Sequence, residues 1–217
     1  MKVNQRKRIF VTATNTDIGK TYTTVKLITE LSKQGYKVGV IKPIETGVIT
    51  HPLDGTILMN TVQKYNKNMK SILIEDIVPI QFVLPAAPYI AKKEKNIEYQ
   101  KIHNAITKIE KYCDLLIIEG AGGLYVPVDE ETMMIDFIEK FNITDTLLVT
   151  HGSLGCINDT ILSQKALLAK KVKFVTAFNC RDIESFQEVS LPFLKENQKE
   201  ILIVDKNIDK IIQQLIE

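Results

Sequence analysis

The residues of this sequence best suited to chemistry are Gly19-Lys20-Thr21, which end the polar loop of VTATNTDIGKTYTT, residues 11–24. A lysine can neutralise nucleotide phosphates, a threonine hydroxyl can bind magnesium, and a glycine lets the backbone approach a phosphate closely. A helix that starts here would add free N–H groups and a partial positive charge. The triplet therefore predicts a phosphate-binding loop, and an ordinary polar turn between strand and helix is the alternative.

The first half of this loop departs from the usual pattern. The spacing G-x-x-x-x-G-K-[ST] requires a glycine at position 14, and a variant with one more residue requires it at position 13. Thr14 and Ala13 stand at these positions. Phosphate binding is still expected from Gly19-Lys20-Thr21, whereas the motif does not define the path of the preceding loop.

A second candidate segment is CDLLIIEGAGG, residues 113–123, an apolar run that ends in Glu119. We predict a strand here, followed by a glycine-rich turn. An acidic residue at the carboxyl end of a neighbouring strand can hold the magnesium ion of a nucleotide, and open α/β sheets bind ligands at that edge. A solvated glutamate before a flexible turn is the alternative.

The third segment is IKPIETG, residues 41–47, which adds Lys42, Thr46 and Gly47 at the end of another strand. A simple nucleotide switch does not need a second lysine near the phosphates. An enzyme that joins the γ-phosphate to an anionic acceptor does, because negative charge builds between the two groups. Lys42 therefore indicates phosphoryl transfer, and a surface lysine before a proline is the alternative.

The elements that must position these residues alternate along the chain. Strands are expected at 9–13, 38–42, 115–119, 146–150, 173–178 and 200–204, and helices at about 20–33, 98–112, 132–141, 156–170 and 206–216. Residues 71–97 predict a strand, a turn and a short helix. The strands are continuous apolar runs, as in a parallel sheet covered on both faces. The pattern predicts a doubly wound α/β fold in a single domain, residues 1–217.

Composition excludes several classes of protein. The 217 residues carry 28 basic and 26 acidic side chains, a net charge of +2, and 45% are hydrophobic. This balance favours neither nucleic-acid nor membrane binding, and no apolar run has the length of a membrane span. Three cysteines without a C-x-x-C pair favour neither a disulfide framework nor a zinc site, so we expect a reduced, cytoplasmic protein. The basic cluster Lys2, Arg6, Lys7 and Arg8 is expected to be a solvated tail.

Taken in order, the motifs resemble those of the dethiobiotin synthetases, ATP-dependent enzymes of biotin synthesis. The segments that carry the resemblance are TNTDIGKT (14–21), KPIETG (42–47), the region of Asp54, the P-x-x-P at 85–88, EGAGG (119–123) and LGCIN (154–158). The resemblance implies a mostly parallel, seven-stranded sheet of the phosphate-loop NTPase type, and a homodimer. It implies conversion of 7,8-diaminononanoate, CO2 and ATP, with Mg2+, to dethiobiotin, through a carbamate and a carbamic–phosphoric anhydride.

The resemblance also implies roles for individual residues. Catalytic roles fall to Lys42, Lys20 and Thr16, and Mg2+ ligands to Thr21, Asp54 and Glu119. The implied nucleotide-binding residues are Asp17, Ile18, Gly19, Lys20, Thr21, Tyr22, Asp54, Glu119, Gly120, Ala121, Gly122 and Asn179, the last of which would read the adenine. The implied substrate-binding residues are Thr16, Lys42, Thr46, Gly123, Leu154, Gly155, Cys156, Ile157 and Asn158, and the last five would complete the site of the partner subunit. Without the resemblance, Asp54-Gly55 indicates only a turn.

One departure from the family lies after Asn179. Family members often have a further helix and a Pro-containing loop that wraps the purine, for which NCRDIESFQEVSLPFLKENQ leaves little room. Ser190, Leu191 and Pro192 are therefore poor candidates for purine contacts, and we expect weaker base selectivity.

Two other classes of function remain. A partitioning or delivery ATPase that switches to bind a protein or nucleic-acid partner has the same sheet, but it usually carries an extra lysine early in the loop, where this chain has Thr14 and Asn15. An amide-forming ligase of cofactor synthesis normally adds a glutamine-using domain, for which the chain leaves no space.

Overall fold

A six-stranded parallel sheet forms the centre of the protein, seen in the computed structural model, which describes residues 7–217. Its strands are β1 (Lys7–Ala13), β2 (Val38–Ile41), β5 (Leu115–Gly123), β6 (Asp145–His151), β7 (Phe174–Asn179) and β8 (Leu202–Ile203), in the order β2-β5-β1-β6-β7-β8. Two short strands, β3 (Ile44–Thr46) and β4 (Ile80–Phe82), pair in parallel beside it. The predicted doubly wound fold is confirmed, with six strands in the main sheet of the described residues where seven were expected.

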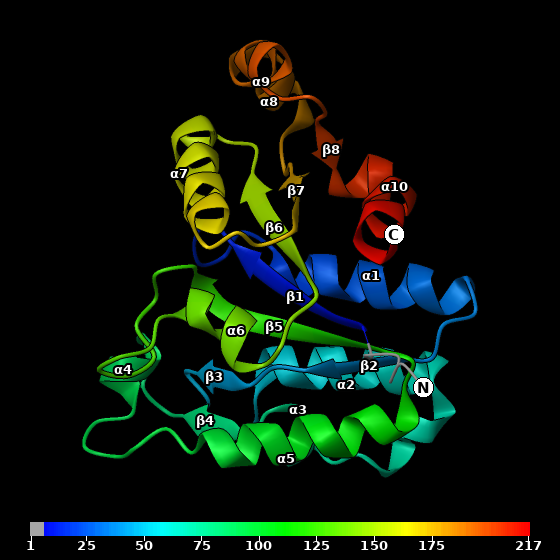
Figure 1. The fold of residues 1–217 in the computed structure, drawn as a ribbon, viewed down its shortest axis with the longest axis vertical. Helices are drawn as coiled ribbons and strands as arrows, with labels where there is room; N and C mark the ends of the chain where they lie inside the picture. The colour runs from blue at the N-terminus through cyan, green and yellow to red at the C-terminus, as the bar shows by residue number, and fades with distance from the viewer. Residues whose placement is uncertain (1–6) are drawn as a thin grey trace.

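Helices cover both faces of this sheet, with α1 and α10 on one side and α6 and α7 on the other (Figure 1). The α-helices are α1 (Lys20–Lys33), α2 (Leu53–Tyr65), α3 (Ile74–Ile77), α4 (Pro88–Ala91), α5 (Tyr99–Ile109), α6 (Phe137–Lys140), α7 (Cys156–Ala169), α8 (Ile183–Val189), α9 (Leu191–Asn197) and α10 (Val204–Ile216). Short 3-10 turns lie at Lys67–Ser71, Glu110–Tyr112 and Met134–Asp136. No helix within residues 7–217 is long and apolar enough to cross a membrane.

The central strands are buried on both faces, which explains their continuous apolar runs. Ile9, Phe10 and Val11 of β1 are fully buried, and so are Ile117 and Ile118 of β5. Strand β1 lies between β5 and β6, so the loop that follows it leaves the middle of the sheet at the carboxyl edge. This placement brings the carboxyl ends of β1, β2 and β5 together at one edge of the sheet.

Helix α2 was not expected from the sequence. Asp54-Gly55 indicated a turn, yet both residues lie in the first helical turn, and Gly55, Leu58 and Val62 form its buried face. A side chain is not tolerated at position 55, since its Cβ would lie 2.1 Å from Cγ2 of Val78. Close packing against the neighbouring chain segment therefore explains a glycine that looks like a turn residue in the sequence.

The glycine-rich segment after Glu119 is not the predicted turn. Strand β5 continues to Gly123, and its register with β1 shifts, because Glu119 pairs with Val11 whereas Gly123 pairs with Ala13. Between these two pairs β5 therefore contains more residues than β1. This irregularity is a β-bulge, which glycines permit in a strand. Glu119 therefore sits inside a strand, immediately before the bulge.

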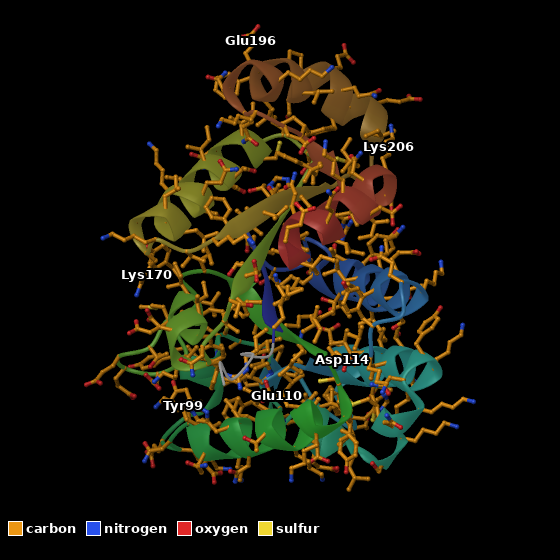
Figure 2. The ribbon with its side chains drawn as sticks, turned by 45° about the vertical axis from the view of Figure 1, so that its right-hand side comes forward. Tyr99, Glu110, Asp114, Lys170, Glu196 and Lys206 are labelled. Carbon is orange, nitrogen blue, oxygen red and sulfur yellow. The ribbon has the colours of Figure 1, made fainter. Side chains whose placement is uncertain are left out.

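Other expectations need smaller corrections. Lys7 and Arg8 belong to β1 and not to a solvated tail, and Arg8 forms an ion pair with Glu110 at 2.7 Å. Glu110 is labelled in Figure 2. Lys2 and Arg6 lie outside the described residues. Most of the strand expected at 200–204 is absent, since only Leu202–Ile203 is extended and α10 starts at Val204. Residues 71–97 contain the expected strand with two short helices, α3 and α4.

The segment after Asn179 holds more helix than expected. It forms α8 and α9, which lie at the end of the molecule marked by Glu196 in Figure 2. Ser190, between the two helices, is 2% exposed and unsuited to contact a nucleotide.

Candidate active site

The loop between β1 and α1 is shaped by two residues in the left-handed region, Asp17 at φ 57° and Gly19 at φ 97°. Gly19 directly precedes the first residue of α1, so the loop ends at the helix N-terminus, where the first N–H groups have no acceptor within the helix. A Cβ at Gly19 would lie 2.0 Å from Nδ2 of Asn179, and this nitrogen donates to the Ile18 carbonyl at 2.8 Å. Asn179, predicted to bind adenine, is thus hydrogen-bonded to the phosphate loop in this structure.

Lys20, the first residue of α1, is 8% exposed, and its Nζ donates to the Asn15 carbonyl at 3.2 Å across the mouth of the loop. Burial first, and then the charge of nearby Lys42, lower the pKa of Lys20 to about 8. An ammonium held in this way gains most from a negatively charged ligand, because the ligand offsets the penalty that lowers its pKa. This is the behaviour expected of a phosphate-binding lysine.

Lys42 joins two acidic residues from different elements. Its Nζ donates to Oδ2 of Asp54 at 2.7 Å and to Oε1 of Glu119 at 2.8 Å. The Thr21 hydroxyl donates to the same Glu119 oxygen at 2.8 Å. The structure therefore brings together four residues that are far apart in the sequence.

Charge inside this cluster is tightly coupled. Burial alone would lower the pKa of Lys42, but the charges of Glu119 and Asp54 outweigh it and hold the pKa above its ordinary value. Burial would likewise raise the pKa of Asp54, but the charge and hydrogen bond of Lys42 outweigh it and keep that pKa below its ordinary value. Lys42 is thus a fixed cation at neutral pH and Asp54 a fixed anion.

The cluster fits a magnesium ion that is shared with a nucleotide. Glu119 is fully buried, and its Oε2 has no hydrogen-bond partner. A buried carboxylate oxygen without a partner is costly unless a cation or a water meets it. Thr21, Asp54 and Glu119 offer oxygen donors alone, which suits Mg2+. No group of three or more His, Cys, Asp or Glu within residues 7–217 could hold a metal by itself, so other ligands would come from phosphates and water.

Glu45 is the site residue that sequence reasoning missed. It is 6% exposed, and its two carboxylate oxygens accept from the N–H groups of Asp54 at 3.1 Å and Gly55 at 2.9 Å. Burial raises its pKa above the ordinary value, although the hydrogen bond from Gly55 opposes this. Glu45 lies within the KPIETG segment, but its role as a hydrogen-bond acceptor becomes visible only once the position of α2 is known.

A cavity of about 600 Å3 connects the loop to these groups. It is lined by Thr16, Asp17, Gly19, Lys20, Thr21, Lys42, Glu45, Thr46, Asp54, Pro85, Ala86, Ala87, Pro88, Ala121, Gly122, Val126 and Arg181. Ten of the predicted site residues are among them. Residues 85–88, which lead into α4, and Val126 add an apolar wall. Arg181, which donates to the Asp17 carbonyl at 2.8 Å, also lines the cavity. The cavity therefore combines charged side chains of both signs with an apolar wall.

Several predicted residues lie outside this cavity. The Tyr22 hydroxyl donates to Asp205 at 2.6 Å, on the side of α1 that faces α10. Gly120 and Gly123 serve the packing of β5, since a Cβ on either would lie within 3.0 Å of Phe10 or of the Thr14 carbonyl. These three positions can therefore offer a ligand their backbone groups, and not side chains that line the cavity.

The segment 154–158 also lies away from the cavity of its own chain. Leu154 is 85% exposed, and a Cβ placed on Gly155, which has φ 96°, would meet no atom within 4 Å. The Cys156 side chain is fully buried beside Phe178 and Phe186. An exposed leucine before an open helix N-terminus leaves this segment free to meet another molecule.

Comparison with known proteins places these features in a family. A family model described as an AAA domain matches residues 7–202. The ATP-dependent dethiobiotin synthetase BioD of Sulfurovum sp. is 46% identical over 85% of this chain and 88% of its own. The proteins of the same name from Wolinella succinogenes and Helicobacter pylori strain J99 are 34% and 32% identical over 97% and 94% of this chain, and over 98% and 97% of theirs.

Solved structures agree on the fold. The MinC:MinD cell division complex of Aquifex aeolicus matches with a TM-score of 0.55 at 17% identity, over 96% of this chain and 86% of that one. A plasmid partition protein of Borrelia burgdorferi matches with a TM-score of 0.57 at 10% identity, over 97% and 96%. At these identities the likeness concerns the fold alone, whereas the close sequence relatives decide the family: the chain belongs to the ATP-dependent dethiobiotin synthetases.

Proposed function

We propose that this protein converts 7,8-diaminononanoate, CO2 and ATP to dethiobiotin, ADP and phosphate in the cavity described above. The observation that carries the proposal is that Lys20, Lys42 and Asp54 line one cavity that also has an apolar wall, while the buried Glu119 is hydrogen-bonded to Lys42. The two lysines suit a triphosphate and an anionic acceptor, and the apolar wall suits an alkyl chain.

The reaction has three bond-forming steps. One amine nitrogen of the diamine attacks the carbon of CO2 and loses a proton, which gives a carbamate. A carbamate oxygen then attacks the γ-phosphorus and ADP leaves, which gives a carbamic–phosphoric anhydride. The second amine attacks the carbonyl carbon and loses a proton as the bond to phosphate breaks, and this closes the cyclic urea and releases phosphate.

The two lysines offset the repulsion between negative groups in the phosphoryl-transfer step. Carbamate and γ-phosphate are both negative, so their approach requires fixed positive charge between them. Lys42, whose pKa is held above its ordinary value, stays charged throughout the neutral range. Lys20 and the N–H groups at the start of α1 hold the phosphates. Thr16 and Thr46, both on the cavity wall, offer hydroxyl groups to the reacting end of the diamine.

Thr21, Asp54 and Glu119 are the proposed ligands of Mg2+. An ion held there would supply positive charge that offsets the negative charge of the phosphates. Glu119 contributes a rigid oxygen, because its side chain is fully buried. Asp54 contributes a movable one, because its side chain is 43% exposed.

The substrate carboxylate lies several bonds from the reacting amines, and we place its binding site on a second copy of the chain. Residues Leu154–Asn158 lie outside the cavity of their own chain, and the helix start at Cys156 offers N–H groups that suit an anion. We therefore propose a homodimer in which this segment completes the partner's site. We also propose that the enzyme is cytoplasmic and has no nucleic-acid partners.

A direct test is to identify the product. The purified protein is supplied with 7,8-diaminononanoate, ATP, Mg2+ and either ordinary or 13C-labelled bicarbonate, and the product is analysed by mass spectrometry. We expect dethiobiotin, heavier by one mass unit with the label. Phosphate release without any product that contains the label would reject the proposed reaction.

A further inference from the structure

We propose that Glu45 is a positioning residue, which holds Asp54 where it can bind the metal ion of the metal–nucleotide complex. The inference rests on the proposed role of Asp54 as a Mg2+ ligand. It assigns a task to a buried carboxylate that neither the phosphate loop nor the chemical steps above use.

The contacts of Glu45 are directed at the backbone of the residue that it would position. One carboxylate oxygen accepts from the N–H of Asp54 itself at 3.1 Å, and the other accepts from Gly55 at 2.9 Å. The Asp54 side chain, in contrast, is 43% exposed, and its ion pair is with Lys42. The direction of the Asp54 side chain therefore depends strongly on how its backbone is fixed.

Glu45 also supplies the N-terminal cap that α2 lacks. The residue before the helix is Pro52, which makes no side-chain cap, and the first-turn N–H groups need acceptors from elsewhere. The carboxylate of Glu45 provides two of them from strand β3, and its negative charge suits the helix N-terminus. The cap thus links the start of α2 to the strand that follows Lys42.

Packing fixes the positions of Glu45 and of the start of α2 relative to each other. Gly55 lies so close to Val78 that a Cβ would meet its Cγ2 at 2.1 Å and Oε2 of Glu45 at 3.3 Å. Strand β3 is held by its pairing with β4, where Glu45 lies opposite Gln81. Because both partners are confined, the two hydrogen bonds set the distance between β3 and the start of α2. Asp54, which faces Lys42 and the cavity, is carried on that connection.

The experiment measures metal binding directly and does not depend on turnover. Mn2+ replaces Mg2+, and its affinity for the protein with a non-hydrolysable ATP analogue is measured by electron paramagnetic resonance. Glu45→Gln keeps the size of the side chain but places an NH2 group against one of the two N–H donors. We expect the Mn2+ affinity to fall about 10-fold, as is typical when a group that orients a metal ligand is lost. Glu45→Asp keeps the charge but shortens the reach, and we expect a loss in the same direction.

A matched control separates positioning from general destabilisation. Asp76 caps α3 through the N–H of Leu73 at 3.0 Å, away from the cavity. Asp76→Asn should lower the melting temperature, as Glu45→Gln does, but leave the Mn2+ affinity unchanged. If Asp76→Asn weakens Mn2+ as much as Glu45→Gln, the effect is structural and the inference is overturned.

A double-mutant cycle with Asp54→Asn completes the test. If Glu45 acts through Asp54, Glu45→Gln should add little further loss of Mn2+ affinity once Asp54 is already changed, although it should still lower the melting temperature. If Asp54→Asn weakens Mn2+ and Glu45→Gln alone does not, the positioning role is wrong and the metal site stands. If Asp54→Asn has no effect on Mn2+ affinity, the assigned metal ligand itself is wrong, and the inference falls with it.

Discussion

Replacing Lys42 by alanine should damage both stability and turnover, through two separable causes. In the folded protein Lys42 satisfies Oε1 of Glu119, a side chain that is fully buried and whose second oxygen has no hydrogen-bond partner. Removing one partner of a buried ion pair costs about 3–5 kcal/mol, because the other charge stays buried. For a chain of this length that corresponds to a melting temperature lower by about 6–20 °C.

The loss of turnover has a different origin. In the proposed reaction Lys42 supplies positive charge where carbamate and γ-phosphate meet, and losing such a group costs roughly 10²-fold or more in rate. Nucleotide affinity should change much less, because Lys20 and the backbone of the loop remain. Turnover is measured by phosphate release at saturating diamine and ATP, well below the melting temperature of the variant, and nucleotide affinity by calorimetry.

The double variant Lys42→Met/Glu119→Gln separates the two causes. It removes both buried charges, so most of the stability should return, while activity should stay low. Near-normal turnover in Lys42→Ala, with the fold intact, would refute the role of Lys42 in the reaction. An unchanged melting temperature would refute the reasoning about the buried pair.

Two further predictions concern Lys20 and the subunit interface. The pKa of Lys20 is lowered to about 8 in the free protein, so at pH 9 this side chain is mostly neutral, and bound phosphates should restore its charge. Binding of an ATP analogue at pH 9 should therefore take up as much as one proton and weaken as pH rises; calorimetry in buffers of different ionisation enthalpy should show this, and Lys20→Arg should abolish the uptake. For the interface, Lys42→Ala and Gly155→Glu subunits, each inactive alone, should regain part of the activity when mixed, because one site of the mixed dimer carries both defects and the other carries none. No recovery in proven mixed dimers would mean that residues 154–158 serve their own subunit.

The sequence was most informative where local chemistry and strand pattern coincide. Lys20, Lys42 and Glu119 follow or interrupt apolar runs, and the parallel sheet brings such positions to one edge whatever the loops between them do. That is why Lys42 and Glu119 lie at the same edge of the sheet, where they form a hydrogen bond that the motifs did not predict, although 77 positions separate them. The fold class followed from the same runs.

The features that sequence reasoning missed depend on tertiary contacts. Glu45 has a purpose only because α2 begins beside it, and α2 was hidden by an Asp-Gly pair that ordinarily indicates a turn. The glycines after Glu119 suggested another turn, yet they form a bulge, because the pairing of β5 with β1 continues beyond it. In each case packing against a distant segment outweighed the local preference of the residues.

The most direct measurement is the dependence of ATP turnover on the diamine. Purified protein is given Mg2+ and ATP, with bicarbonate and 7,8-diaminononanoate added separately and together, and phosphate release is followed over time. An enzyme that transfers the γ-phosphoryl group to a carbamate should release phosphate slowly with either addition alone and rapidly with both, with one dethiobiotin formed per phosphate. An equal rate of phosphate release with and without the diamine would contradict the proposed reaction and favour an ATPase that acts as a conformational switch.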